Sequence, residues 1–261
     1  MSKILRIANI AALVMTIAVN YLSNSGAFNG VTIAELSGRY HTLITPAGYT
    51  FSIWGLIYLS LLAFIVYQGR GLFKGLKSEA DELVLQIGWW FVISCLANSL
   101  WVIVWLFDYI WVSVIVMLVL LFSLLKIIVN TNMERWDAPK SIIIYFWWPF
   151  CLYAGWITVA TIVNIAAYLT KIGWDGFGLS EVLWTLIMLI IAGAIYLFMI
   201  WSRNMREYAL VGVWALIGIA VANWQTHTII SWVALVVSVM LLINTGIHGY
   251  RNRHASPFFR R

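Results

Sequence analysis

The chain has 261 residues, of which 63% are hydrophobic and only 10% are charged, and its net charge is +6. A soluble domain of this length needs many more charged residues to cover its surface, so the composition excludes a soluble globular protein. The positions of the basic residues, described below, explain the positive charge without a nucleic-acid partner, and no nucleic acid is expected.

Eight apolar segments are long enough to cross a bilayer as helices. Each is continuously apolar, whereas the strands of a membrane barrel alternate apolar and polar residues. A helix needs about 20 apolar residues to span a hydrocarbon core of roughly 30 Å. We therefore predict an all-α, polytopic membrane bundle of about eight transmembrane helices. The predicted spans are 4–22, 48–68, 84–107, 110–129, 141–168, 181–201, 208–223 and 228–249.

The basic residues divide sharply between the two sides of this predicted bundle. With the N-terminus inside, all of the 16 lysine and arginine residues except Arg39 and Lys171 fall in inner segments. An excess of Lys and Arg on the cytoplasmic side is the rule for membrane proteins. We therefore expect an integral protein of the bacterial plasma (inner) membrane, with both termini in the cytoplasm and the lipid bilayer as its surroundings.

Loop 24–47 is the longest connection on the predicted outer side, and residues 31–37 within it are expected to form a short helix. Long ordered loops are often functional, so this loop is a candidate lid over a cavity. A solvated connector is the alternative interpretation.

The predicted spans hold neutral polar and aromatic residues, and none carries Asp, Glu, Lys or Arg at its centre. Ionisable residues inside the membrane usually mark proton relays and ion-coupled transport, so their absence argues against both. Neutral groups such as Asn98 and Asn164 either hydrogen-bond across helices or orient a flat, apolar ligand between aromatic walls. The sequence contains no convincing catalytic or metal-binding motif, so no metal ligand is predicted.

Three motifs, which occur in order on three predicted helices, resemble the TspO/MBR family of tryptophan-rich sensory or translocator proteins. The second span is similar to the family's W-x-x-L-Y helix, the third to its L-N-x-x-W element, and the fifth to its P-Y-x-x-W…L-N element. The residues that carry these motifs are Trp54, Tyr58, Leu96, Asn98, Trp101, Tyr153, Trp156 and Asn164.

The resemblance covers about residues 1–168, and it implies that the first five spans form the family's five-helix fold. We therefore expect a TspO-like five-helix membrane domain at 1–168. Three additional transmembrane helices and a short basic cytoplasmic tail follow at 169–261. Relatives in the family often dimerise, so the resemblance also implies a homodimer.

The resemblance implies a small hydrophobic ligand, either a tetrapyrrole such as protoporphyrin or haem, or a sterol-like lipid. The ligand would lie between the first, second and fifth helices under the outer loop, and the protein would act as a sensor or receptor that requires no cofactor. The expected ligand-binding residues are Pro46, Phe51, Trp54, Tyr58, Asn98, Trp101, Tyr153, Trp156 and Asn164.

Two alternatives to a sensor stay open. A passive carrier or flippase for a hydrophobic small molecule would fit eight helices, and an intramembrane enzyme would act on a pigment or an isoprenoid. Some relatives are linked to porphyrin photodegradation, which needs a loop tryptophan six positions before Trp54. Gly48 occupies that position here, so we assign no catalytic residue.

Overall fold

The computed structural model describes residues 1–40, 42–72 and 79–253, and within these ranges it is helical without strands. Four of the basic residues assigned to inner segments, Lys74, Lys77, Arg260 and Arg261, lie outside the described residues. The α-helices are α1 (Ser2–Asn24), α2 (Ile33–Arg39), α3 (Ile53–Gly69), α4 (Glu79–Ile87), α5 (Trp90–Leu106), α6 (Ile110–Asn130), α7 (Lys140–Ile142), α8 (Trp148–Lys171), α9 (Glu181–Arg203), α10 (Arg206–Asn223) and α11 (Thr228–Arg251). The short 3₁₀ or π segments are η1 (Gly48–Ser52), η2 (Arg70–Leu72), η3 (Ile143–Trp147) and η4 (Gly176–Gly178).

These helices confirm the predicted membrane bundle. In the described ranges, seven helices are long and apolar enough to cross a membrane, and α4 with α5, bent by 53°, makes an eighth if the pair counts as one span. The bend lies at Gly88, whose φ of +56° is a left-handed conformation that glycine adopts without steric cost. The third predicted span is therefore two helices with a sharp turn between them.

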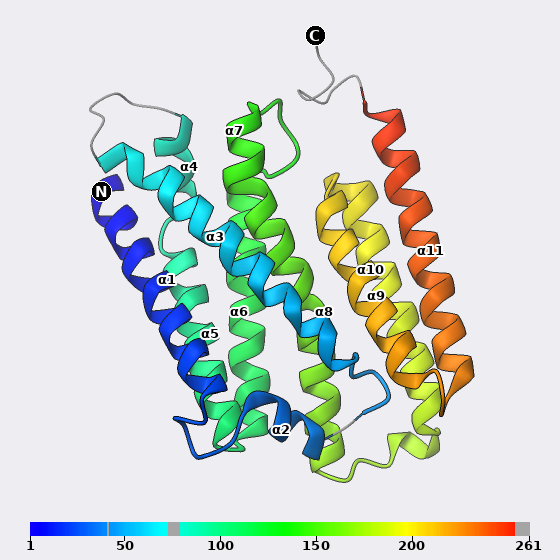
Figure 1. The fold of residues 1–261 in the computed structure, drawn as a ribbon. Coiled ribbons are helices and arrows are strands. Elements are labelled where there is room, and N and C mark those ends of the chain that lie inside the picture. Colours follow the sequence, from blue (N-terminus) through cyan, green and yellow to red (C-terminus); the bar gives the residue numbers. More distant parts are fainter. Residues whose placement is uncertain (41, 73–78, 254–261) are drawn as a thin grey trace.

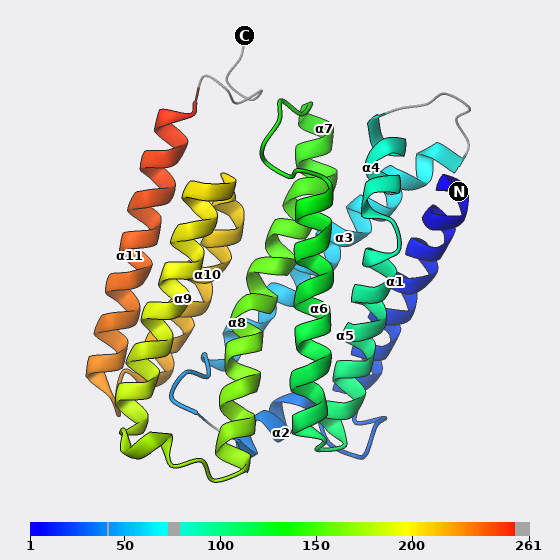
Figure 2. The ribbon, with the colours of Figure 1, turned by 180° about the vertical axis from the view of Figure 1, so that it is seen from behind.

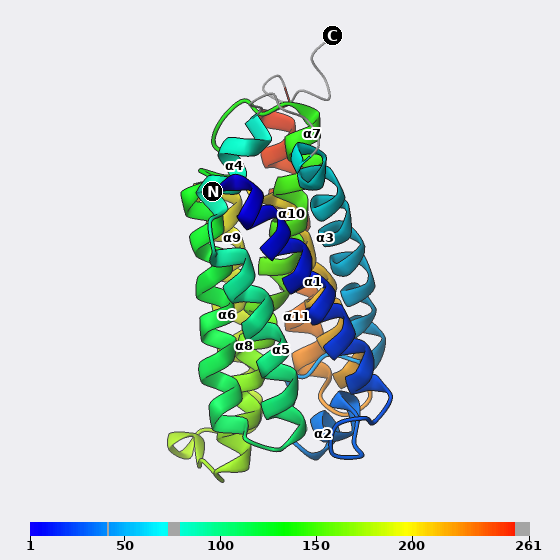
Figure 3. The same cartoon turned by 90° about the vertical axis from the view of Figure 1, so that its left-hand side faces the viewer.

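The two ends of the bundle carry different features. The start of α1 and the end of α11 lie at one end, which we call the terminal end (Figure 1). Helix α2 lies across the opposite end, which we call the lid end (Figure 3). Seen from behind, α6 runs the length of the bundle between these ends, beside α8 (Figure 2).

Helix α2 confirms the short helix that was expected within loop 24–47. Its first turn is closed by a capping box between Thr32 and Glu35. The Glu35 backbone N–H donates to Thr32 Oγ1 at 3.2 Å, and the Thr32 N–H donates to Glu35 Oε2 at 2.7 Å. Such a reciprocal pair satisfies two backbone donors that a short helix otherwise leaves open.

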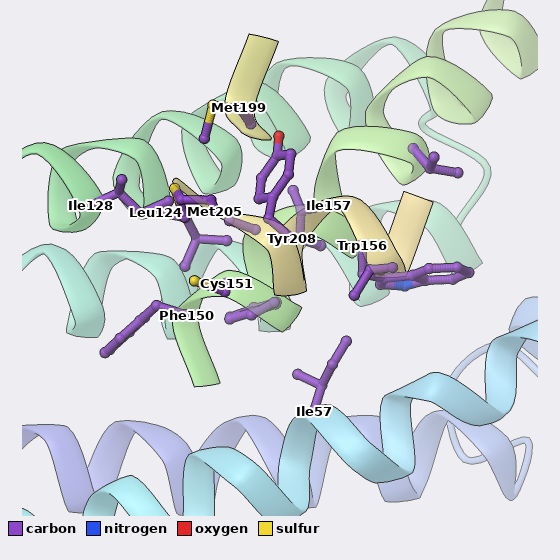
Figure 4. Packing of buried hydrophobic residues seen from close by; sticks show 14 of the residues in the cluster. Ile57, Leu124, Ile128, Phe150, Cys151, Trp156, Ile157, Met199, Met205 and Tyr208 are labelled. Atoms are coloured by element: carbon purple, nitrogen blue, oxygen red, sulfur yellow. The ribbon is translucent and has the colours of Figure 1, made fainter. Parts of the chain in front are cut away.

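Helix α8 runs through the middle of the bundle. Figure 4 shows Tyr208 of α10 on one side of it and Ile57 of α3 on the other. A Cβ atom added at Gly155 would lie only 2.7 Å from the Tyr208 carbonyl oxygen, so α8 and α10 approach closely because this residue is glycine. Small residues at helix contacts are the usual means of close packing in membranes.

The last three helices join the bundle through α10, which packs against α8, α9 and α11. Tyr196 of α9 also reaches α8, where its hydroxyl donates a 2.8 Å hydrogen bond to the Gly155 carbonyl. The side chain of Tyr196 lies against Gly212 of α10, where a Cβ atom would meet its ring at 2.5 Å. The C-terminal helices are therefore tied to the middle of the bundle by both polar and steric contacts.

Candidate ligand-binding site

A cavity with two chambers lies at the lid end of the bundle. The larger chamber has a volume of about 590 Å³ and the smaller one has about 60 Å³. Small-molecule sites typically occupy roughly 300–1,000 Å³, a range that includes the larger chamber. The chambers share part of their lining, namely Ile33, Ser37, Pro46, Phe51, Trp54 and Trp101.

Trp54, in the first turn of α3, is the central aromatic residue of the cavity. Its ring stacks on Tyr58, one helical turn later, with centroids 5.3 Å apart and an angle of 21° between the planes. It also makes edge contacts with Tyr153 at 5.9 Å and Trp156 at 6.4 Å. These contacts fix the orientation of the Trp54 indole while it lines both chambers.

Trp101 of α5 is held by a chain of hydrogen bonds. Its indole N–H donates to Asn164 Oδ1 at 2.7 Å, and Asn164 Nδ2 donates to Ser113 Oγ at 2.9 Å. The Trp101 ring also stacks on Trp105 with centroids 5.6 Å apart. Asn164 therefore orients an aromatic wall and joins three helices, in agreement with a helix-pinning role.

Asn98 and Tyr153 lie behind the cavity wall and line neither chamber. Asn98 Nδ2 donates to the Tyr153 hydroxyl at 3.0 Å, and Asn20 of α1 donates to Asn98 Oδ1 at 2.8 Å. Both residues are buried, so their polar groups are used in joining α1, α5 and α8. The amide side chains that line the larger chamber are those of Asn20 and Asn24.

The structure thus gathers most of the predicted site residues around one cavity. Pro46, Phe51, Trp54 and Trp101 line both chambers, Tyr58 lines the larger one, and Trp156 and Asn164 line the smaller one. Whether they contact a ligand stays a prediction. Sequence reasoning missed the stripe that α1 contributes to the larger chamber, which consists of Ile17, Asn20, Tyr21 and Asn24. Its signal in the sequence is the helical spacing of two amides at the end of an apolar span.

The Tyr58 hydroxyl is buried and has no hydrogen-bond partner among the described residues. Leaving such a group unsatisfied costs about 1–3 kcal/mol. Tyr58 lines the larger chamber, but its hydroxyl oxygen has almost no exposed surface, so a ligand would reach it only after neighbouring side chains moved.

Helix α2 closes the cavity at the lid end. Its Leu36 is buried in a small cluster with Trp105 of α5, while Ile33 and Ser37 line the chambers. Beyond the helix, the Tyr40 hydroxyl donates to Asp108 Oδ1 at 2.8 Å.

The carboxylate that anchors the lid is held by two partners. Lys171 Nζ lies 2.9 Å from Asp108 Oδ1, and the Tyr40 hydroxyl hydrogen-bonds to the same carboxylate. Partial burial would raise the pKa of Asp108, but the hydrogen bonds from Lys171 and Tyr40 outweigh it and lower this pKa below its ordinary value. The carboxylate therefore stays charged at mildly acidic pH.

The loop that carries Pro46 is fastened to α10. The Ala47 N–H donates to the Gly218 carbonyl at 3.0 Å, and the Trp214 indole N–H donates to the Thr50 carbonyl at 2.9 Å. A Cβ atom at Gly218 would lie 2.1 Å from Thr50 Oγ1. The C-terminal helices therefore hold one wall of the cavity in place.

A family model described as TSPO-like protein matches residues 6–247 of the chain. The chain belongs to this family. The match begins in α1 and ends in α11, so it takes in nearly the whole bundle. No curated protein and no solved structure matches the chain.

Family membership confirms the resemblance that the three motifs indicated, and together with the apolar helices it shows an integral membrane TSPO-like protein. The division of the chain near residue 168 stays a prediction. Gly48, which stands where the TspO/MBR motif has a tryptophan, lines the larger chamber, and a Cβ atom there would meet nothing within 4 Å. The place that the tryptophan side chain takes in the family motif is thus open space in this chain.

Proposed function

We propose that the protein is a membrane sensor or receptor that binds a flat hydrophobic ligand, either a porphyrin- or haem-like tetrapyrrole or a sterol-like lipid. The observation that carries this proposal is the aromatic lining shared by both chambers, with Phe51, Trp54 and Trp101 at the junction. Aromatic faces favour stacking with a flat ligand and bury a large apolar surface.

The polar groups of the cavity support a largely apolar ligand. Neither chamber has a charged side chain among its lining residues, and the polar ones are neutral amides and hydroxyls. Asn20 and Asn24 line the larger chamber, where their amides would orient a ligand by hydrogen bonds. Apolar walls with a few convergent polar groups are typical of small-molecule sites.

A sensor role is supported by what the cavity walls are attached to. Helix α2 is anchored to the α5–α6 turn at Asp108, and the loop with Pro46 is anchored to α10 at Gly218. A ligand that displaced α2 would change its contact with Asp108, and one that displaced the loop would change its contact with Gly218. Because these walls come from separate parts of the chain, ligand binding would alter their relative positions.

We also propose that the terminal end faces the cytoplasm and the lid end faces outward. This orientation would place Arg39 and Lys171 outside and most other basic residues inside, as the charge rule favours. The ligand would then enter from the outer side or from the outer leaflet.

The proposal is tested by titrating protoporphyrin IX into the purified protein in nanodiscs and following the main porphyrin absorbance band. Trp54→Ala is expected to weaken binding by about tenfold, which corresponds to about 1.4 kcal/mol of lost aromatic contact. Trp232→Ala is the matched control, because Trp232 is exposed on α11 and lines neither chamber, and it is expected to bind like wild type.

A competition arm separates the two ligand classes. A sterol added to the porphyrin-loaded protein should displace the porphyrin if both use the same chambers. Equal porphyrin binding by wild type and Trp54→Ala would contradict the placement of the site. The absence of saturable binding of both ligand classes would contradict the proposed function.

A further inference from the structure

A second cavity of about 460 Å³ lies on another side of α8, between the lid-end halves of α8 and α9. Ile162 and Ala166 of α8 line it, whereas Trp156 and Asn164 of the same helix line the first site. Helix α8 therefore separates the two cavities, and no residue of the second lines the first.

The polar end of the second cavity is built around two tryptophans. The rings of Trp174 and Trp184 have centroids 5.0 Å apart, and the Trp184 indole N–H donates to the Gly176 carbonyl at 2.6 Å. Gly176 has a φ of +67°, and a Cβ atom there would lie 2.9 Å from the Trp184 ring. The turn between α8 and α9 is therefore shaped to hold this indole in place.

Two carboxylates lie at the same end of the cavity, and no Lys, Arg or His is among its lining residues. Asp175 Oδ1 accepts from the Phe177 N–H at 3.0 Å, and Glu181 Oε1 accepts from the Leu43 N–H at 3.3 Å. Each of these hydrogen bonds uses one oxygen of a carboxylate and holds that side chain in place. Carboxylates beside indole faces attract a cation both by charge and by the electron density of the rings.

The other end of the cavity is apolar. Ile162 of α8 and Met188 and Ile191 of α9 line it. The chemistry thus changes along the cavity, from acidic and aromatic near residues 174–181 to aliphatic toward the middle of the helices. A molecule that matches both ends has a cationic head and an apolar chain.

We propose that this cavity binds a single-chain amphiphile with a cationic head, such as an alkyl quaternary ammonium or a long-chain amine. The head would lie between the indoles of Trp174 and Trp184 and the carboxylates of Asp175 and Glu181, and the chain would lie along Met188. This inference does not rest on the function proposed for the first site, whose lining has no charged side chain.

The experiment uses octyltrimethylammonium as the probe, titrated calorimetrically into the protein in zwitterionic nanodiscs, with empty nanodiscs subtracted. Saturable binding of this cation is expected, together with no saturable binding of octyl sulfate, which has the same chain and the opposite charge. Glu181→Gln should weaken binding by threefold to tenfold, and Met188→Trp, which fills the apolar end, should weaken it by at least tenfold.

Two matched variants control for charge and for bulk. Glu82→Gln makes the same charge change on exposed residue 82 of α4, at the terminal end, and Ile190→Trp adds the same indole at an exposed position of α9. Both are expected to bind the cation like wild type. Equal loss in a variant and its control would overturn the assignment.

Four further outcomes overturn the proposal. The first is no saturable binding by wild type beyond empty nanodiscs, and the second is unchanged affinity in both Glu181→Gln and Met188→Trp. The third is equal binding of octyl sulfate, and the fourth is weaker binding in Met188→Trp without any change in Glu181→Gln. Either of the last two outcomes contradicts a cationic head group. Glu181 is exposed, so its replacement by Gln tests the site without disturbing a buried core.

Discussion

The two halves of the bundle use aromatic residues in different ways. In the half near the terminal end, Phe64 makes edge contacts with Phe91, Phe146 and Phe150 at centroid distances of 5.1–5.2 Å, and all four rings are buried. In the half near the lid end, Trp54 contacts other rings but also lines an open cavity. The packing between α3, α5 and α8 is therefore dense near the terminal end and leaves a cavity near the lid end.

The polar residues follow the same division. Arg6 is buried near the terminal end, where it hydrogen-bonds to the Gln68 carbonyl and to Asp81. The cavity near the lid end is lined by neutral polar groups such as Asn20. The contrast teaches that dense packing at the terminal end holds these helices in place, so that their lid-end parts can form the walls of a cavity.

The largest expected effect on stability comes from removing a buried ring in the densely packed half near the terminal end. Phe64→Ala should lower the free energy of unfolding by about 3–5 kcal/mol, because it leaves a cavity among three buried rings. Trp54→Ala should cost less, since one side of that ring already faces open space. Denaturant unfolding in detergent micelles measures both, with Phe122→Ala, at an exposed position on α6, as the control. A loss in Trp54→Ala as large as that in Phe64→Ala would break the comparison.

The next effect tests whether the contact between α10 and the cavity loop supports the half near the lid end. Gly218→Ala places a Cβ atom 2.1 Å from Thr50 Oγ1 and should destabilise the fold by about 1–3 kcal/mol while displacing the cavity loop. Gly246→Ala on α11 meets nothing within 4 Å, so it should be neutral or stabilising by about 0.5–1 kcal/mol. Thermal unfolding and porphyrin titration of both variants give the comparison. Equal behaviour of the two glycines would show that α10 does not support the loop.

A pH-dependent effect is expected at the terminal end. Burial, and then the nearby Glu207 carboxylate, raise the pKa of Glu134 to about 8 from an ordinary value of 4.5, against the opposing effect of Arg206. The folded state therefore binds a proton that the unfolded chain releases. The free energy of unfolding should therefore fall as pH rises from about 4.5 to about 8.

The pH effect is checked by measuring unfolding at several pH values in wild type and Glu134→Gln. The variant should lose this fall, because Gln has no proton to release. Glu82→Gln, at an exposed position, should keep it. A pH dependence that survives in Glu134→Gln would assign the effect to another group.

The smallest effect concerns the lid. Tyr40→Phe removes the hydrogen bond to Asp108 and should cost about 1 kcal/mol. Ligand dissociation should become faster, because α2 would open more often. Stopped-flow dissociation of bound porphyrin measures this, and Tyr109→Phe, at an exposed neighbouring tyrosine, is the control. Unchanged dissociation in Tyr40→Phe would mean that α2 does not limit ligand exchange.

The sequence predicted which residues lie near the cavity better than it predicted which of them line it. Trp54 and Trp101 were expected at the cavity and lie there, but Asn98 and Tyr153 lie behind its wall and hydrogen-bond to each other. Asn20, which faces the larger chamber, was missed. In a chain of apolar spans, lipid-facing and core-facing sides differ little in composition, so the sequence does not show which way a polar residue points.

Hydropathy and the positions of Lys and Arg determined the number of passes and their approximate ends, because a bilayer imposes one length and one polarity on every span. Only the tertiary structure decided how each helix is rotated, and with it the cavity, the lid contact at Asp108 and the close approach of Gly218 to the loop. Helix rotation depends on packing between helices distant in sequence, where lipid and protein are similarly apolar and small residues and hydrogen bonds select the contacts.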